Sequence, residues 1–276
     1  MVGDELRQGG SVAELTAGVR AGYDAAAEEW ADGPGQMYAQ LATVLVASAP
    51  VPLAGSRVLD LGAGAGVAGR AALAVGACQV VGVDLSLGML RRGDAAWCPV
   101  AADAVALPFR DGSFDLVVAA FCLNHLDSLA AGLAESRRVG AAIAASMFAP
   151  GWTHPSKDAV DDVLGSFGYR PPAWYASLMP GSRASDPEAL AEAAAAAGFT
   201  GVRVHTAAVR TGLATPAELA SWRLGMAHVA PFLRSLDAPG RAALRCAAEQ
   251  AVAEQAMAAK AGAEPLVVSM VVLTAR

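Results

Sequence analysis

The chain has 276 residues, of which 55% are hydrophobic and 17% are charged, and its formal net charge is −6. This composition predicts one folded domain rather than a disordered chain, and the negative charge argues against a nucleic-acid partner, because phosphate binding needs a basic surface. No stretch approaches ~20 uninterrupted apolar residues, so we expect no span of a membrane.

Residues 1–48 are predicted to be helical. Tyr23 and Trp30 are seven residues apart and would share one helix face, and Gly33-Pro34-Gly35 would interrupt the helix. This segment either packs over an edge of the sheet or forms a lid over a ligand. A linker follows at residues 49–55, which contain two prolines.

From residue 57 onward, apolar runs typical of buried strands alternate with helical patterns. This alternation predicts an α/β fold with a doubly wound, mostly parallel sheet of seven strands and helices on both faces. The pattern alone does not give the direction of the last strand. The expected strands are residues 57–61, 79–83, 97–101, 114–120, 141–148, 201–209 and 265–274.

Two segments interrupt the alternation and are predicted to be insertions, at residues 150–185 and 213–261. The first is rich in proline, glycine and aromatic residues. The second opens with Thr215-Pro216-Ala217-Glu218, a capping box that predicts a helix start. We therefore expect one domain with a helical segment at 1–48 that is either edge packing or a lid, a ligand-binding half at 49–149, the two insertions and a final strand at 262–276.

The most informative stretch is Ser56–Gly69, SRVLDLGAGAGVAG, in which an apolar strand runs into closely spaced glycines and then a helix. Glycines let the backbone turn sharply and approach a ligand closely. A second apolar run ends at Asp84, which places a carboxylate beside the same crevice. This arrangement predicts a nucleotide-type site at the carboxyl ends of parallel strands.

The glycine spacing also fits the dinucleotide fingerprint G-x-G-x-x-G. Asp60, two residues before Gly62, argues against a dinucleotide because its carboxylate would repel a pyrophosphate. A ligand with an ammonium or sulfonium group would instead be attracted. S-adenosylmethionine has that charge pattern.

The motifs VLDLGAGAG, GVDLSLGML, AADAVALPF and FDLVVAAFCLNHL follow one another between Val58 and Leu126. In order and spacing this stretch resembles the class I S-adenosylmethionine-dependent methyltransferases, especially the ubiquinone-biosynthesis-like (type 11) enzymes that act on small molecules. YDAAAEEW, beginning at Tyr23, is also similar to the segment with which this family covers its cofactor.

The resemblance implies which residues bind S-adenosylmethionine. Asp84 would accept hydrogen bonds from the ribose hydroxyls, Asp103 and Ala104 would contact the adenine, and Phe121 would lie near the methionyl end. Asp103 has the alternative role of capping a helical turn. The full expected cofactor set is Tyr23, Asp60, Gly62, Ala63, Gly64, Gly66, Asp84, Leu85, Met89, Asp103, Ala104 and Phe121.

His125 follows the fourth strand and His154 lies in the first insertion, and these two are the predicted catalytic candidates, as a base or as a group that orients the acceptor. A structural histidine is the alternative for His125. Aromatic residues of the insertions suit a flat, fairly apolar acceptor. The predicted acceptor-binding residues are Tyr38, Trp152, Trp174, Tyr175, Trp222 and His228, the last on an expected helix at residues 221–229.

The sequence thus predicts a methyltransferase that moves a methyl group by in-line displacement to an O, N or C atom of a small acceptor, typical of secondary metabolism. The alternatives are a non-methylating, cyclase-like enzyme or regulatory protein that binds S-adenosylmethionine, and an NAD-dependent oxidoreductase. No metal site is expected, because the four cysteines lack C-x-x-C spacing and were interpreted as buried free thiols.

Two further expectations concern the protein's surroundings. Residues 1–10 contain acidic residues and no apolar core, so we expect no secretory signal and a cytoplasmic location. The expected partners are a small-molecule acceptor and, at most, a second copy of the chain, as a monomer or homodimer, with no nucleic acid and no membrane.

Overall fold

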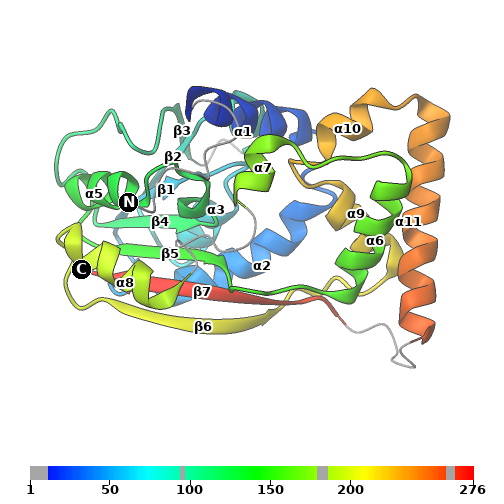
Figure 1. Ribbon diagram of the computed structural model, residues 1–276. Coiled ribbons are helices and arrows are strands. Elements are labelled where there is room, and N and C mark those ends of the chain that lie inside the picture. The colour runs from blue at the N-terminus through cyan, green and yellow to red at the C-terminus, as the bar shows by residue number, and fades with distance from the viewer. Residues whose placement is uncertain (1–11, 94–96, 179–185, 259–264) are drawn as a thin grey trace, which may run out of the picture.

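A computed structural model describes residues 12–93, 97–178, 186–258 and 265–276. Its centre is a single seven-stranded sheet with the strand order β3-β2-β1-β4-β5-β7-β6 (Figure 1). The strands are β1 (Arg57–Leu61), β2 (Gln79–Asp84), β3 (Cys98–Ala101), β4 (Leu116–Ala120), β5 (Ile143–Phe148), β6 (Arg203–Arg210) and β7 (Val267–Ala275).

The parallel part of the sheet confirms the predicted doubly wound fold. β1 pairs in parallel with both β2 and β4, and β5 extends this set. β7 is antiparallel to both of its neighbours, β5 and β6. It therefore lies between two strands that precede it in the chain, and residues 211–266 connect it to β6.

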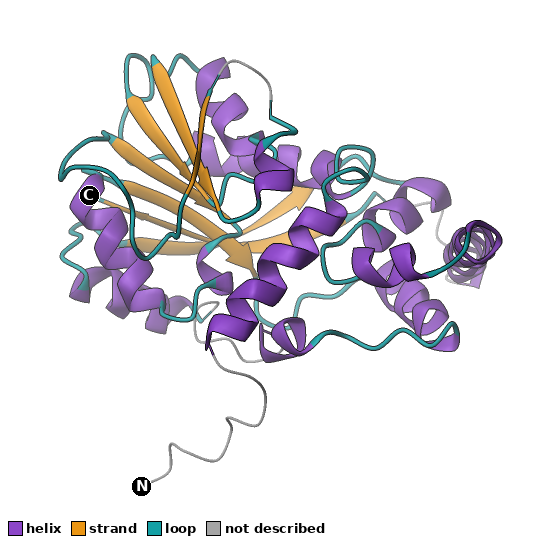
Figure 2. Cartoon of the chain, turned by 90° about the horizontal axis from the view of Figure 1, so that it is seen from above, coloured by secondary structure: helices purple, strands orange, loops and turns teal. Residues whose placement is uncertain are grey.

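Helices cover both faces of the sheet (Figure 2). They are α1 (Val12–Ala26), α2 (Pro34–Ala47), α3 (Val67–Ala74), α4 (Leu87–Leu90), α5 (Leu129–Val139), α6 (Pro155–Ser166), α7 (Ala173–Leu178), α8 (Pro187–Ala196), α9 (Pro216–Leu224), α10 (Ala230–Ser235) and α11 (Ala238–Ala258), with a 3₁₀ turn η1 (Leu123–His125).

The core has two layers because neighbouring residues of a strand point to opposite faces. Val58 packs with α2 and α3 in one layer, whereas Leu59 packs with α5 and α8 in the other. Both side chains are fully buried, so the sheet has an apolar core on each of its faces.

We call α6, α7, α9, α10 and α11 the helical cap. Figure 1 shows α6, α9, α10 and α11 gathered at one side of the molecule, beyond the sheet. α6, α9 and α11 pack on one another, and α7 and α10 pack on α1. Among the described residues, none of these helices is long and apolar enough to cross a membrane.

Several element boundaries differ from the sequence-based expectation. The break after α1 lies at residues 27–33, and α2 begins at Pro34 itself, because proline is well tolerated in the first turn of a helix. α5 is capped by the Ser128 side chain, which accepts from the Ala131 N–H. Three cysteines are exposed, and only Cys122 is buried.

Candidate active site

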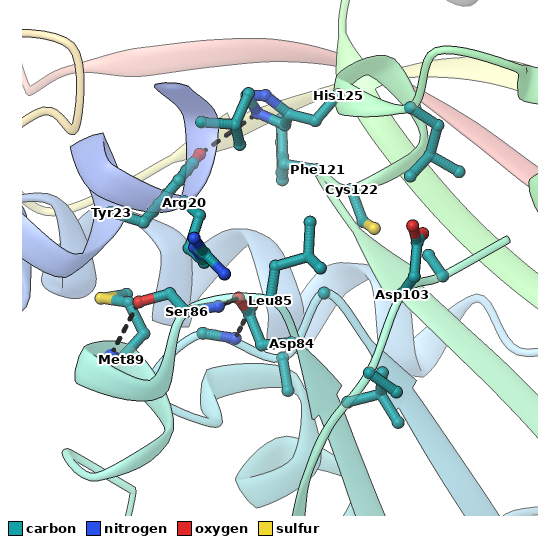
Figure 3. Close-up of a pocket in the computed structure, with 18 of the residues that line it drawn as sticks. Arg20, Tyr23, Asp84, Leu85, Ser86, Met89, Asp103, Phe121, Cys122 and His125 are labelled. Carbon is teal, nitrogen blue, oxygen red and sulfur yellow. Dashed lines mark hydrogen bonds between the residues drawn. The ribbon is translucent and has the colours of Figure 1, made fainter. Parts of the chain in front are cut away.

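A cavity of about 600 Å³ lies at the carboxyl ends of β1, β2, β3 and β4. Its walls are the loops that follow these strands, and one face of α1 closes it from the other side (Figure 3). In an open α/β sheet, the edge where the strands end is where ligands bind. The cavity is therefore the candidate active site.

The loop after β1 forms the floor of this cavity through tightly turned glycines. Gly62 and Gly64 have positive φ angles of 68° and 55°. A Cβ atom at Gly62 would lie 2.5 Å from Sγ of Cys122, so only glycine fits there. Gly66 is the N-cap residue of α3 and is not among the residues that line the cavity. The prediction that Gly66 contacts the ligand is thus not supported, because this glycine serves the turn into the helix.

Asp84 joins the loops that follow β1 and β2. Its Oδ2 accepts from the Gly64 N–H at 2.8 Å, and its Oδ1 accepts from the Ser86 N–H at 2.8 Å. Burial raises the pKa of Asp84, and the two backbone hydrogen bonds oppose that rise. Each carboxylate oxygen can accept a second hydrogen bond, so Asp84 is able to hold a ligand with two adjacent hydroxyl groups.

Asp60 lies deeper in the cavity wall and is only 1% exposed. Its Oδ2 accepts from the Gly69 N–H at 2.7 Å, whereas its Oδ1 is buried without a hydrogen-bond partner. Burial raises the pKa of Asp60 to about 7. An unpaired buried carboxylate oxygen is unfavourable, and a cationic ligand group in the cavity would relieve it.

The opposite wall is built by the loop after β3. Asp103 and Ala104 line the cavity, as do Leu85 and Met89 from the loop after β2 and from α4. Oδ1 of Asp103 accepts from the Val105 N–H at 3.0 Å, so this carboxylate also caps a turn. Both roles considered for Asp103 are therefore compatible with its position.

His125 and Tyr23 meet across the cavity. The Tyr23 hydroxyl lies 3.2 Å from Nε2 of His125, and Nδ1 of His125 is buried without a partner (Figure 3). Burial lowers the pKa of His125 to about 4 and raises the pKa of Tyr23, so both side chains are neutral near pH 7. His125 thus lines the cavity and has one ring nitrogen without a partner among the described residues.

Aromatic rings form the wall beside His125. The rings of Trp30 and Tyr38 stack with centroids 5.4 Å apart, and Phe121 meets Tyr38 edge to face at 5.2 Å. All three residues line the cavity. Phe121 has a positive φ of 55°, and its N–H donates to the Ser146 carbonyl. A positive φ is rare for a bulky residue and is typical of functional sites.

Five residues predicted to bind an acceptor do not line the cavity, because they pack against other rings in and around the helical cap. Trp152 stacks on Phe148. Trp174 fills a groove on the outer side of α1, where a Cβ atom at Gly22 would lie 2.9 Å from its ring. Of the predicted acceptor-binding residues, Tyr38 alone reaches the cavity. The five that do not are Trp152, Trp174, Tyr175, Trp222 and His228.

His228 lies in the turn between α9 and α10, not on a helix. Nη1 of Arg223 donates to Nε2 of His228 at 2.9 Å, so Nδ1 carries the proton and bonds the Tyr169 hydroxyl at 2.7 Å. Tyr175 stacks on the imidazole ring at 3.6 Å. These contacts leave both ring nitrogens occupied, which makes His228 a structural residue of the cap.

His154 is likewise distant from the cavity wall. Its Nδ1 accepts from the Ser156 N–H at 3.2 Å, and the residue is the N-cap of α6. The prediction that His154 takes part in catalysis is therefore not supported by its position, since a side chain that caps a helix start is held there.

Sequence reasoning missed several cavity residues on the inner face of α1 and next to the predicted motifs. Arg20 lies one helical turn before Tyr23, so it faces the same way (Figure 3). Ser86 and Cys122 follow Asp84 and Phe121 closely in the chain. The helical spacing from Tyr23 could have indicated Arg20, whereas nothing in the pattern singled out Cys122.

Residues 59–142 match the model of a family described as a methyltransferase domain. The chain is 44% identical over 107 residues to a demethylmenaquinone methyltransferase of Beutenbergia cavernae, covering 36% of this chain and 43% of that protein. It is 31% identical over 154 residues to the Streptomyces griseus protein of the same name, and the match covers 53% of this chain and 65% of that protein. These comparisons support a class I S-adenosylmethionine-dependent methyltransferase.

Solved structures agree with this methyltransferase in fold. Haemonchus contortus phosphoethanolamine N-methyltransferase 2, in complex with S-adenosyl-L-methionine, has a TM-score of 0.50 at 20% identity, covering 85% of this chain and 51% of that one. A Haloferax volcanii methyltransferase bound to its Trm112 activator has a TM-score of 0.52 at 17% identity, and the match covers 92% of this chain and 96% of that one.

The match to the family model covers only part of this chain. The chain spans about two-fifths of the length of three curated relatives that it matches. The family model ends at residue 142, before the helical cap begins. The matched part thus contains Asp60, Asp84, Asp103 and His125, but not the cap.

Proposed function

We propose that the protein transfers a methyl group from S-adenosylmethionine to a small, largely apolar acceptor. The observation that carries the proposal is the pairing of two carboxylates in one cavity. Asp84 is able to accept from a pair of hydroxyls, and Asp60 presents a buried, unpartnered Oδ1. A ligand that is a nucleoside at one end and a cation at the other satisfies both.

The residues present fit this cofactor along the whole cavity. Asp84 would accept from the ribose, and Asp103 with the N–H of Ala104 would face the adenine between the apolar side chains of Leu85 and Met89. Asp60 would face the cationic end, where unlike charges a few ångströms apart attract by roughly 4 kcal/mol at intermediate dielectric. The tight turn at Gly62 leaves the backbone close to this ligand.

Bound S-adenosylmethionine supplies a methyl group already activated by the sulfonium, so the protein mainly aligns the acceptor and excludes water. His125 is neutral because of its low pKa, and its Nδ1 would hold a hydroxyl or amine of the acceptor. In the tautomer with the proton on Nε2, which donates to the Tyr23 oxygen, Nδ1 is also able to take up a proton. α1 lines the same cavity and would limit the access of water to both groups.

We further propose a flat, quinone-like acceptor. The rings of Trp30, Tyr38 and Phe121 all line the cavity and give it an aromatic wall. Flat ring systems bury well against such side chains. The similar proteins named demethylmenaquinone methyltransferase support the same class of acceptor.

The first test is titration calorimetry with S-adenosylhomocysteine and, in parallel, with NADH. We expect micromolar binding of S-adenosylhomocysteine and none of NADH. A turnover assay then supplies S-adenosylmethionine with a reduced naphthoquinone, a simple phenol, an amine and an enol, and follows the S-adenosylhomocysteine formed. The naphthoquinol should be methylated fastest.

The variant His125→Gln tests the role of His125 in turnover. If His125 takes up a proton, turnover should fall by about 10²–10⁴-fold while the affinity for S-adenosylhomocysteine stays within about twofold. Binding of S-adenosylhomocysteine without methylation of any acceptor would point instead to a non-methylating or regulatory protein. Binding of NADH alone would overturn the proposal.

A further inference from the structure

Asp24 follows Tyr23 on α1 and bonds away from the cavity, to the segment after β2. Its Oδ1 accepts from the Ser86 hydroxyl at 2.6 Å and from the Gly88 N–H at 2.8 Å. Two donors on one carboxylate oxygen make a charge-assisted contact, which is stronger than a hydrogen bond between neutral groups. Asp24 is exposed, but both of its donors belong to the loop that carries cofactor-site residues.

Ser86 connects Asp24 to residues of the cavity wall through further hydrogen bonds. Its side chain is 1% exposed, and its Oγ also accepts from the Met89 N–H at 3.0 Å, as the dashed line in Figure 3 marks. Its own N–H donates to Asp84, whose other oxygen holds the Gly64 N–H. An unbroken chain of hydrogen bonds therefore runs from α1 through Asp84 to the glycine loop.

The close approach of α1 to this loop depends on Gly88. A Cβ atom at Gly88 would lie 2.9 Å from Oδ1 of Asp24 and 3.1 Å from its Cα. The two segments are thus in direct contact at this point. Burial is the main cause of the raised pKa of Asp84, and the nearby charge of Asp24 raises it further.

We propose that Asp24 is a positioning residue of the cofactor site, which fixes α1 against the loop that bears Asp84, Leu85 and Met89. This inference rests on the proposed function. α1 carries Tyr23 and Arg20 to the cavity, so its docking completes the walls around the cofactor. Tyr23 and Asp24 bond in two directions, one to His125 and the other to Ser86, and together they join the acceptor end to the cofactor end.

Docking of α1 then contributes to cofactor affinity. When only a fraction of the molecules has the docked helix, the apparent dissociation constant rises by the reciprocal of that fraction. Asp24→Ala removes both hydrogen bonds and lowers the docked fraction. Asp24→Asn keeps an amide oxygen that accepts from the same two donors, so it should restore most of the affinity.

The experiment measures the dissociation constant of S-adenosylhomocysteine for three variants by calorimetry. We expect Asp24→Ala to raise it about tenfold, the size of one hydrogen bond to a charged group, and Asp24→Asn to raise it less than about threefold. Glu28→Ala is the matched control, because it also removes an acidic side chain near the end of α1, but one engaged only in exposed ion pairs with Arg92 and Arg234.

Hydrogen exchange gives a second measurement. If Asp24 only stabilised the fold, its replacement would not change the protection that the ligand adds. In the wild type, S-adenosylhomocysteine should slow amide exchange in residues 12–26 and 84–89 together, and in Asp24→Ala this joint protection should weaken. Gly88→Ala approaches the same contact from the other side and should raise the dissociation constant as well. In turnover assays of Asp24→Ala, the KM for S-adenosylmethionine should rise while kcat stays near the wild-type value.

The outcomes separate the two proposals. Wild-type affinity in both Asp24→Ala and Gly88→Ala would overturn the positioning role and leave the proposed function intact. If the wild-type protein does not bind S-adenosylhomocysteine, the proposed function itself fails. A loss in Asp24→Asn as large as in Asp24→Ala would also contradict the hydrogen-bond argument.

Discussion

At the scale of single residues, Asp60 determines how the cavity responds to pH. Its carboxyl group is buried, its pKa is raised to about 7, and one oxygen has no partner. In the free protein near pH 6 this group is mostly protonated. A cationic ligand stabilises the ionised form, so binding at that pH must release a proton.

Affinity for S-adenosylmethionine should therefore increase as pH rises toward 7 and then level off. With a free-protein pKa of about 7, we expect about a fivefold gain in affinity between pH 6 and pH 7. His125 does not contribute to this change, because its pKa is about 4. Calorimetry at several pH values, in buffers with different ionisation enthalpies, measures both the affinity and the proton released.

Asp60→Asn is the control for this pH dependence. The amide oxygen still accepts from the Gly69 N–H, so the loop keeps its shape, but the charge is gone. The variant should bind more weakly and lose most of its pH dependence between 6 and 7. Burial also raises the pKa of Asp84, and an unchanged pH profile in Asp60→Asn would assign the effect to Asp84 instead.

The same residue scale shows what local sequence can predict. Asp60 and Asp84 were predicted to face the cavity because each stands at or just before the end of a buried strand, where the register fixes its position. Trp174 was misassigned because ring side chains bury well in any apolar surrounding. Its partners, Gly18 and Gly22 of α1, are more than 150 positions away, so no local pattern could indicate that contact.

At the scale of elements, the cap helices α6 and α9 are joined by an ion pair. Nε and Nη2 of Arg223 donate to the two carboxylate oxygens of Asp161 at 2.6 and 2.9 Å. The Arg223 side chain is 6% exposed and that of Asp161 is 32% exposed. Arg57 and Asp115 make a comparable pair between β1 and the turn before β4, but both of their side chains are 46% exposed.

Asp161→Ala should destabilise the protein far more than Asp115→Ala. Removing Asp161 leaves a buried guanidinium without its carboxylate, and we expect a loss of about 2–3 kcal/mol, below the range for fully buried pairs because Asp161 is partly exposed. Asp115→Ala should change stability by about 0–1 kcal/mol. Urea denaturation of both variants measures the difference. Equal losses would mean that Arg223 finds solvent or another acceptor.

Element boundaries were harder to predict than the elements themselves. The capping box at Thr215 is predictable from the sequence, because its side chains bond to nearby N–H groups. α9 ends at Leu224, so His228 is not helical, and Gly225 at the C-cap was the overlooked signal. The break after α1 begins before the Gly33-Pro34-Gly35 stretch that predicts it, at residues 27–33, where no glycine or proline precedes Gly33.

At the scale of the whole molecule, the periodic strands and helices were enough to predict the doubly wound sheet. The position of β7 was not predictable from its own residues. Its apolar run fits a buried strand in either direction, and its antiparallel place between β5 and β6 depends on the path of the chain through α9, α10 and α11. Long connections of this kind leave no local trace in the sequence.

The cavity also joins two parts of the molecule that differ in their likeness to relatives. The loops after β1, β2 and β3 lie within the stretch matched by the family model, whereas Trp30 and Tyr38 lie before it. The ring pair Trp30–Tyr38 and the carboxylates Asp60 and Asp84 thus come from different segments, so the proposed acceptor end and cofactor end can be tested separately. A substitution at one end should alter the binding of one ligand and leave the other nearly unchanged.

Asp84→Ala and Tyr38→Leu test this separation. Asp84→Ala removes a carboxylate that holds the Gly64 and Ser86 N–H groups, and it should weaken S-adenosylhomocysteine binding by about 10- to 100-fold.

Tyr38→Leu removes the ring stacked on Trp30. It should raise the KM of an aromatic acceptor by about tenfold, within the range of ring-stacking energies, while S-adenosylhomocysteine affinity stays within about twofold. Tyr38→Phe, which keeps the ring, is the control for the hydroxyl. If Tyr38→Leu weakened both ligands equally, the two ends of the cavity would form one site whose walls move together, and the acceptor would have to be sought elsewhere on the surface.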